Sequence, residues 1–181
     1  PGLAPVTFSE AAVRVLASRK APVQSWYLDV GMIRRYWSED RFYHHTAPVS
    51  MVLALHEALS IVLEEGLEAR FRRHRLHSRA LQAGLEAMGL VLPVEPAYRL
   101  PSLTAVTVPD GVDDSRLRRE LLDGYGIEIG GGLGELKGKV LRIGTMGYSA
   151  TRANVLLCLA ALEDCLGRQG FEAPRGAAVA A

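Results

Sequence analysis

In Gly138-Lys139-Val140-Leu141-Arg142-Ile143-Gly144, an arginine stands within an apolar run that predicts a β-strand. Side chains alternate along a strand, so Arg142 points off one face of the sheet, beside the glycine-rich segment 130–134. Its planar guanidinium suits two-point binding of a carboxylate. That carboxylate can belong to a substrate or to an internal Asp or Glu, and internal pairing is the commoner use of a strand arginine.

Two further strands and two helices surround this one in the sequence. Residues 103–108 alternate and are β-branched, and Ile127-Glu128-Ile129 is a short apolar run, so both predict strands. Residues 113–122 predict an amphipathic helix, and Thr151 caps a helix with a buried apolar face. The order strand, helix, strand, strand, helix predicts an α+β layer, with helices on one face of a mostly antiparallel sheet.

The first half of the chain reads as helical. Ser9 caps a helix to about Lys20, and residues 23–29 read as extended chain. Thr46 caps a longer helix with Pro48 in its first turn. Gly66 interrupts that helix, and a further helix runs over residues 67–88 and stops at Gly89.

Composition limits the function classes. The 181 residues carry 21 Lys plus Arg against 20 Asp plus Glu, so no overall charge recruits nucleic acid or an anionic membrane. A small polar partner is favoured. No apolar run approaches the ~20 residues that cross a bilayer, and Cys158 and Cys165 read as core thiols in a reducing compartment, which predicts a cytoplasmic protein.

Three local motifs have two interpretations each. Tyr43-His44-His45-Thr46 precedes the expected helix start and can hold a phosphate, although simple capping by Thr46 is the commoner case. The run 130–134 either lets another group approach the backbone closely or is a flexible hairpin loop, and it fits no known phosphate-binding loop. His74 and His77 have helical spacing, but the surrounding arginines repel a cation, so we expect a solvated helix face and no metal site.

Four segments stand in order along the chain: Phe42-Tyr43-His44-His45-Thr46-Ala47-Pro48, Ile127-Glu128-Ile129-Gly130-Gly131-Gly132-Leu133-Gly134, the segment 138–144 quoted above, and Ala150-Thr151-Arg152-Ala153-Asn154-Val155. In order and spacing they resemble the C-terminal half of the class V aminotransferases, and within that family the alanine:glyoxylate (serine:pyruvate) type. The resemblance runs from about residue 1 to about residue 166.

The resemblance implies an α/β protein, the C-terminal part of a fold type I pyridoxal-phosphate transferase. Residues 1–65 would end the large cofactor-binding domain and include the segment at the dimer interface. Residues 66–166 would form the small α+β domain, and residues 167–181 a disordered tail. It further implies a homodimer with the cofactor site at the subunit interface, acting on small amino acids and 2-oxo acids.

The resemblance also assigns roles residue by residue. Tyr43 and Thr46 match the pair that reaches the cofactor phosphate of the other subunit, and Arg142 matches the arginine that grips the substrate α-carboxylate. Gly131 and Gly132 match glycines that line the substrate side of the site. The Schiff-base lysine of the family lies upstream of Pro1 in its pattern, so we expect no catalytic residue in this chain and no activity of the isolated chain.

The activity that follows is amino transfer from alanine or serine to glyoxylate. One alternative is a related pyridoxal-phosphate reaction, ureidoglycine:glyoxylate transamination or cysteine desulfuration. Desulfuration needs a cysteine on a mobile loop, which Cys158 and Cys165 on a core helix do not provide. The other alternative is a non-catalytic domain that dimerises or binds a partner.

Overall fold

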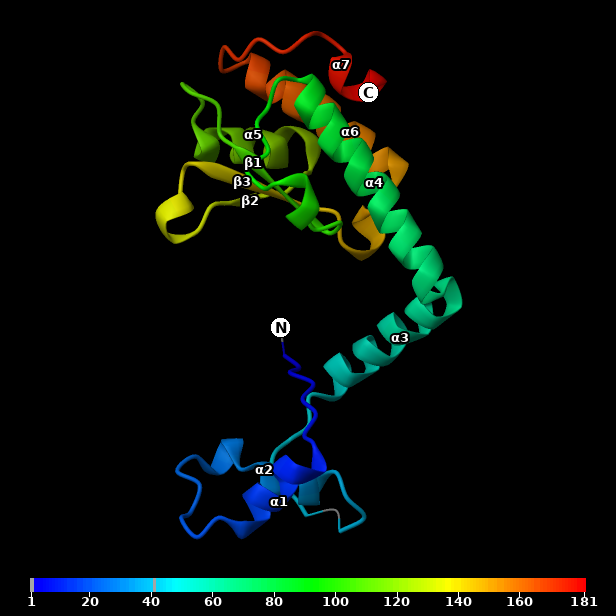
Figure 1. Cartoon of the computed structure of the whole chain (residues 1–181), viewed down its shortest axis with the longest axis vertical. Coiled ribbons are helices and arrows are strands. Elements are labelled where there is room, and N and C mark those ends of the chain that lie inside the picture. Colours follow the sequence, from blue (N-terminus) through cyan, green and yellow to red (C-terminus); the bar gives the residue numbers. More distant parts are fainter. Residues whose placement is uncertain (1, 41) are drawn as a thin grey trace. The chain divides into compact units, whose positions relative to one another are not determined.

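The computed structural model describes residues 2–40 and 42–181, so Pro1, where the first predicted domain begins, lies outside the described residues. The chain divides into two compact units, Pro1–Glu64 and Glu65–Ala181, and each is described by itself (Figure 1). Among the described helices, none combines the length and the apolar character that a membrane crossing needs.

Helices make up the first unit: α1 (Glu10–Ser18), the short 3₁₀ turn η1 (Trp26–Leu28), α2 (Val30–Tyr36) and α3 (Val49–Glu65). Ser9 caps α1 as predicted, its hydroxyl accepting from the Ala12 amide at 3.3 Å. The extended chain expected over residues 23–29 is wrong at Trp26–Leu28, which form the 3₁₀ turn η1, whereas the backbone of Asp29 is extended. Asp29 starts α2, because its carboxylate accepts from the Gly31 and Met32 amides at 2.9 and 3.2 Å.

Almost nothing is buried within the first unit. Among its described residues, His44 is the one fully buried side chain, and the apolar residues of α3 are exposed or only half-buried. A unit of this kind lacks the apolar core that stabilises an independent domain.

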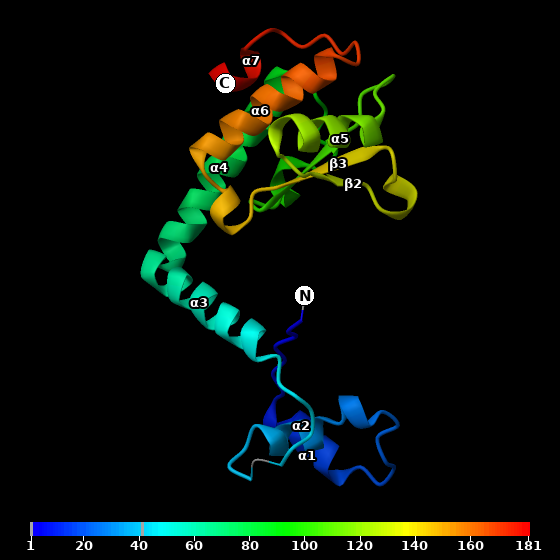
Figure 2. The same cartoon turned by 180° about the vertical axis from the view of Figure 1, so that it is seen from behind.

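A three-stranded antiparallel sheet and three long helices form the second unit. The strands β1 (Leu103–Thr107), β2 (Gly130–Gly131) and β3 (Val140–Gly144) lie in the order β1-β3-β2. The helices α4 (Leu67–Ala87), α5 (Asp114–Tyr125) and α6 (Arg152–Gly167) cover one side of this sheet (Figures 1 and 2). The predicted α+β order is confirmed.

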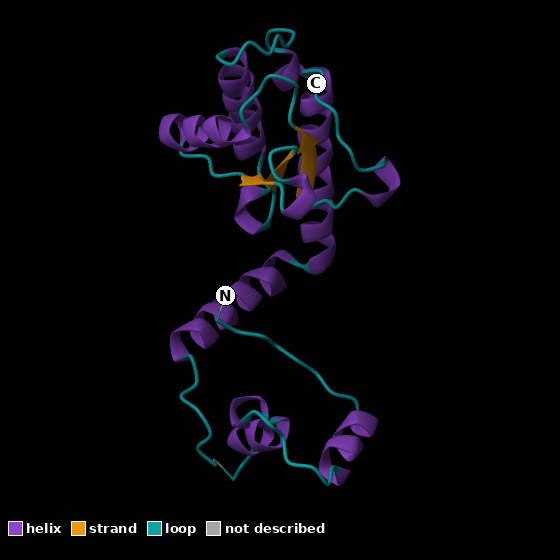
Figure 3. Cartoon of the chain, turned by 90° about the vertical axis from the view of Figure 1, so that its left-hand side faces the viewer, coloured by secondary structure: helices purple, strands orange, loops and turns teal. Residues whose placement is uncertain are grey.

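The core lies between those helices and the inner face of the sheet, where β1 contributes Val106 and β3 contributes Leu141 and Ile143. Leucines 81, 85, 117, 121, 159 and 162 fill it from the helices and are almost fully buried. Short turns complete the unit: η2 (Pro96–Tyr98), η3 (Gly134–Leu136) and η4 (Gly147–Ser149) (Figure 3).

Most helix ends fall where the sequence predicts. Gly66, with φ +78°, separates α3 from α4, and Gly89, with φ +84°, follows the end of α4. Thr151 caps α6 by accepting from the Asn154 amide at 3.2 Å. The strand expected over residues 127–129 is displaced. The Ile127 amide donates to the Leu121 carbonyl at the end of α5, so pairing with β3 begins only at Gly130, the first residue of β2.

The C-terminal tail differs from the expectation of disorder. It ends in a short helix, α7 (Ala177–Ala180), and Ala178 is buried against α4. A Cβ on Gly84 would lie 2.6 Å from the Ala178 carbonyl oxygen, so the bare glycine makes room for this contact. Gly84 therefore lets the backbone of α7 pack closely on α4.

Candidate functional site

Arg142 lies on the central strand between two of the smallest residues of the sheet. The register places Ala105 of β1 and Gly130 of β2 directly opposite it. Facing residues on neighbouring strands have adjacent side chains, so these two leave the guanidinium uncrowded on the outer face. This face is the one turned away from the core, because Leu141 and Ile143 point inward.

One backbone contact fixes the Arg142 side chain. Its Nε donates to the Gly131 carbonyl oxygen at 2.7 Å. Among the described residues, no carboxylate forms an ion pair with it, so the internal pairing weighed above does not occur within this part of the chain. Within the part of the chain that the structure describes, the terminal nitrogens of this half-buried guanidinium make no protein hydrogen bond, so the group can bind an external carboxylate at two points.

Each of the glycines 130–132, together called the glycine platform, leaves room for a charged or polar group beside the backbone. A Cβ on Gly130 would lie 3.2 Å from a terminal nitrogen of Arg142, and one on Gly131 would lie 3.2 Å from the Asp114 carboxylate. A Cβ on Gly132 would lie 1.9 Å from the Leu136 carbonyl oxygen. Close approach, one of the two interpretations of this segment, is therefore what the structure shows.

Two hollows meet at Arg142. One, of about 350 Å³, is mostly apolar and is lined by Leu100, Leu103 and Leu136. The other, of about 610 Å³, is lined by charged residues of α5 and of the loop before β3. Both include Gly132, Leu133 and Arg142, so the arginine stands on the border between an apolar and a polar surface.

Tyr43 and Thr46 come together in the other unit. The tyrosine hydroxyl and the threonine Oγ1 lie 2.7 Å apart, and both side chains are exposed. Two adjacent hydroxyls supply donors for the oxygens of a phosphate group. The pair therefore fits the phosphate of the cofactor that the resemblance implies.

The predicted N-cap role of Thr46 is wrong, because α3 begins three residues later, at Val49. Pro48 disfavours a helical conformation at Ala47, and its own carbonyl accepts the Val52 amide. A phosphate at Thr46 would therefore be held by side chains and not by a helix terminus.

Two histidines, His44 and His45, hold the segment 43–46 in place. The Trp26 carbonyl can only accept, so His44 Nε2 donates to it at 2.9 Å. In the neutral ring Nδ1 of His44 is then an acceptor, and the Nδ1 of His45 donates to it at 2.8 Å. The buried His44 ring also stacks at 4.4 Å on Trp26. These contacts fix the backbone between Tyr43 and Thr46.

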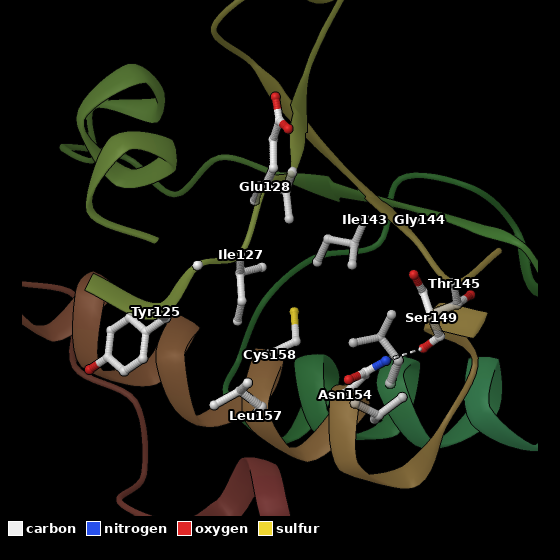
Figure 4. A pocket seen from close by; sticks show the side chains of 14 residues that line it. Tyr125, Ile127, Glu128, Ile143, Gly144, Thr145, Ser149, Asn154, Leu157 and Cys158 are labelled. Carbon is white, nitrogen blue, oxygen red and sulfur yellow. Dashed lines mark hydrogen bonds between the residues drawn. The ribbon is translucent and has the colours of Figure 1, made fainter. Parts of the chain in front are cut away.

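Another hollow, of about 290 Å³, lies between β3 and helix α6, among Ile127, Ile143 and Cys158 (Figure 4). It contains none of the predicted cofactor- or substrate-binding residues. Burial raises the pKa of the Cys158 thiol to about 11, so the sulfur stays protonated and is a poor nucleophile. This setting does not provide the mobile-loop cysteine of desulfuration.

The arginine-rich face of α4 is not simply solvated, which corrects the sequence interpretation. Arg73 donates to both carboxylate oxygens of Glu65 and to the carbonyls of Gly147 and Ala150. His74 accepts from the Gly147 amide at 3.2 Å and bonds to the Arg70 carbonyl through its other nitrogen. These contacts fasten the segment after β3 to the start of α4. Within the described residues, no group of side chains is arranged to hold a metal ion.

The sequence pattern does not mark Asp114, Arg118 and Lys137 as site residues, yet they line the same hollow as Gly131 and Gly132. Arg118 pairs with Asp114 at 3.1 Å across one helical turn. An i,i+4 acid–base pair is visible in the sequence, but it usually marks a solvated helix face. Only the fold shows that this pair packs on Gly131.

Comparison with known proteins identifies the relationship. (S)-ureidoglycine–glyoxylate transaminase of Bacillus subtilis is 44% identical over 95% of this chain and 46% of its own length. Alanine–glyoxylate aminotransferase of Callithrix jacchus is 45% identical over 92% of the chain and 41% of its own length. The chain is homologous to the C-terminal part of class V aminotransferases. No protein-family model matches it.

The structures agree with this class V relationship. The crystal structure of ureidoglycine-glyoxylate aminotransferase from Bacillus subtilis superposes with a TM-score of 0.92 at 46% identity, covering 97% of this chain and 45% of that one. The predicted fold, the C-terminal part of a fold type I pyridoxal-phosphate aminotransferase, is confirmed. The chain spans about half the length of the curated relatives it matches.

Proposed function

We propose that this chain contributes the substrate-carboxylate site of a pyridoxal-phosphate transaminase that moves an amino group from alanine or serine to glyoxylate. The observation that carries the proposal is the Arg142 guanidinium, held by the Gly131 carbonyl and left without an internal carboxylate among the described residues. Amino acids and 2-oxo acids share the carboxylate that such a group binds. Class V relatives named for glyoxylate support the acceptor.

Each expected site residue takes one role in this proposal. Arg142 binds the α-carboxylate and orients the acid. Gly131 anchors Arg142 and, with Gly132, keeps the surface beside the acid free of side chains. Tyr43 and Thr46 donate to the cofactor phosphate. The cofactor, when bound, supplies the electron-withdrawing ring that amino transfer requires.

Amino transfer from ureidoglycine to glyoxylate is a second candidate. It is favoured by the relative from Bacillus subtilis, whose sequence matches 95% of this chain. Both candidates share glyoxylate as acceptor and both need the carboxylate site at Arg142. They differ in the donor, so a comparison of alanine, serine and ureidoglycine as donors separates them.

A homodimer in the cytoplasm completes the proposal. Tyr43 is 69% exposed although its hydroxyl is placed by Thr46, which suits a residue that serves a neighbouring subunit. The first unit buries almost no apolar side chain, and Leu53, Leu59 and Leu63 of α3 are more than half exposed. Such a surface is covered in stable oligomers. The two free, buried cysteines suit a reducing compartment.

The test is the kinetics of the natural polypeptide that contains this chain. Pyruvate formation from alanine and glyoxylate is measured for the wild type, Arg142→Gln and the control Arg72→Gln, an exposed arginine of α4. Losing a charge-assisted contact of this kind lowers kcat/KM roughly 100-fold for donor and acceptor alike. Equal kinetics in wild type and Arg142→Gln would refute the assignment.

A further inference from the structure

The polar hollow beside Arg142 contains more positive charge than a single carboxylate needs. Arg118, Lys137 and Arg142 line it, and Asp114 is the one acidic residue among its lining residues. Asp114 is already paired with Arg118, whose Nε and one terminal nitrogen donate to the same carboxylate oxygen at 3.3 and 3.1 Å. Two cations, Lys137 and Arg142, remain without a carboxylate partner among the described residues.

The glycine platform explains how Lys137 reaches this place. Gly132 has no side chain, so the Leu136 carbonyl oxygen packs directly on its Cα. The turn η3 closes with the Lys137 amide donating to the Gly134 carbonyl at 3.1 Å. The loop thus folds back on its own start, and Lys137, five residues beyond Gly132 in the chain, lines the same hollow as Gly132 and Arg142.

Lys139 differs from Lys137 although it is only two residues away. Its backbone carbonyl accepts from the Val108 amide, where β3 starts against β1, and it does not line the hollow. The two lysines therefore have the same charge and similar exposure but different positions with respect to Arg142.

We propose that Lys137 is a specificity-determining residue that binds a second carboxylate of the substrate, while Arg142 binds the first. The inference rests on the proposed function, because it takes Arg142 as the α-carboxylate site. It adds a further substrate class to the monocarboxylic acids of the proposed function, namely the short dicarboxylic 2-oxo acid and the matching acidic amino acid. Two like charges in one concave polar surface raise the local concentration of a dianion. The neighbouring hollow is mostly apolar, and Arg99, the one cation besides Arg142 among its lining residues, is already paired with Glu86 at 2.8 Å. A second carboxylate entering that hollow would therefore lose its hydration without meeting an unpaired cation other than Arg142.

Binding to the full chain tests this without requiring turnover. Isothermal titration at low ionic strength compares 2-oxoglutarate with 2-oxopentanoate, which has the same carbon chain but lacks the second carboxylate. The wild type should bind 2-oxoglutarate about fivefold more tightly, a modest ratio because Lys137 is exposed, and added salt should reduce it. Lys137→Gln should abolish this preference and leave 2-oxopentanoate binding unchanged, whereas the control Lys139→Gln should keep the preference.

The variants separate the two proposals. If Arg142→Gln loses both acids but Lys137→Gln keeps the preference, the role of Lys137 is refuted and that of Arg142 stands. If the wild type binds neither acid, or Arg142→Gln binds both as well as the wild type, the carboxylate site itself is refuted. Inorganic phosphate that displaces 2-oxoglutarate at equal concentration would show a general anion surface and would also overturn the specificity role.

Discussion

The hydroxyl of Tyr43 and the Oγ1 of Thr46 lie 2.7 Å apart on a segment that belongs to no helix or strand. The buried His44 between them is held at both ring nitrogens, by the Trp26 carbonyl and by His45. The buried histidine thus fixes the segment that carries the two hydroxyls. One of them donates to the other in this structure, which leaves one O–H free at the surface.

If this pair binds the cofactor phosphate, removing one hydroxyl weakens cofactor binding. Tyr43→Phe keeps the ring but loses the donor, and it should lower the affinity for pyridoxal phosphate about tenfold in the natural polypeptide. Equilibrium dialysis measures this loss. Tyr148→Phe, which removes another exposed tyrosine hydroxyl, is the control and should bind like the wild type. Equal affinity in both variants would contradict the phosphate role.

The Glu65 carboxylate makes stability depend on pH. Its hydrogen bonds with Arg73, more than those with Arg70, lower its pKa from 4.5 to about 2. A carboxylate with a lowered pKa stabilises the folded state fully above pH 4.5 and loses that contribution as the pH falls toward 2. Wild-type stability should therefore decline through this range.

Glu65→Gln should unfold at a lower temperature than the wild type at pH 7, and the difference should shrink as the pH falls toward 2, where about half of the wild-type carboxyl groups in the folded state are uncharged. Thermal unfolding followed by circular dichroism measures both points. Glu68→Gln, at an exposed position on the first turn of α4, should follow the wild-type curve. A constant difference between Glu65→Gln and wild type at all pH values would argue against the ion pair as its cause.

Two glycines of the second unit should respond to alanine in opposite directions. Gly132→Ala places a Cβ 1.9 Å from the Leu136 carbonyl oxygen, so the loop must shift, at a cost of about 1–3 kcal/mol in unfolding free energy. Gly124→Ala meets no atom within 4 Å in helix α5 and should stabilise by about 0.5–1 kcal/mol. Denaturant unfolding measures both, and a neutral Gly132→Ala would refute the close approach.

Much of the second unit follows from sequence periodicity and capping. Thr151, Gly66 and Gly89 mark helix ends because each satisfies a local requirement of the backbone. Pro48 also acts locally, yet its effect on Ala47 moved the helix start away from Thr46. At this position the restriction that Pro48 imposes on Ala47 outweighs the capping preference of Thr46.

The site could be predicted only in part. The Arg142 strand was visible because charge and apolar residues alternate, but its partner Gly131 was not, since a backbone carbonyl leaves no signal in side-chain pattern. The glycine run showed that something approaches closely. It could not show that Asp114, Arg142 and the Leu136 carbonyl are the groups that do so, because these contacts depend on tertiary packing.

The thiol of Cys158 should be chemically silent in the folded protein. Burial keeps its pKa near 11, so little thiolate exists at neutral pH. Alkylation by iodoacetamide should be slow in the native state and fast in denaturant, as measured by mass spectrometry. Rapid native labelling of Cys158 would show that this region opens, and would reopen the case for a reactive cysteine.

The Arg142 Nε–H, which donates to the Gly131 carbonyl, reports directly on whether Arg142 binds a carboxylate. Titration of the ¹⁵N-labelled chain with pyruvate, followed at the Arg142 Nε–H and the Gly131 and Gly132 amides, is the most direct measurement. We expect saturable shifts at these positions that vanish in Arg142→Gln and persist in Arg72→Gln. Absence of shifts at Arg142, or the same shifts at Gly131 and Gly132 in Arg142→Gln, would contradict the claim.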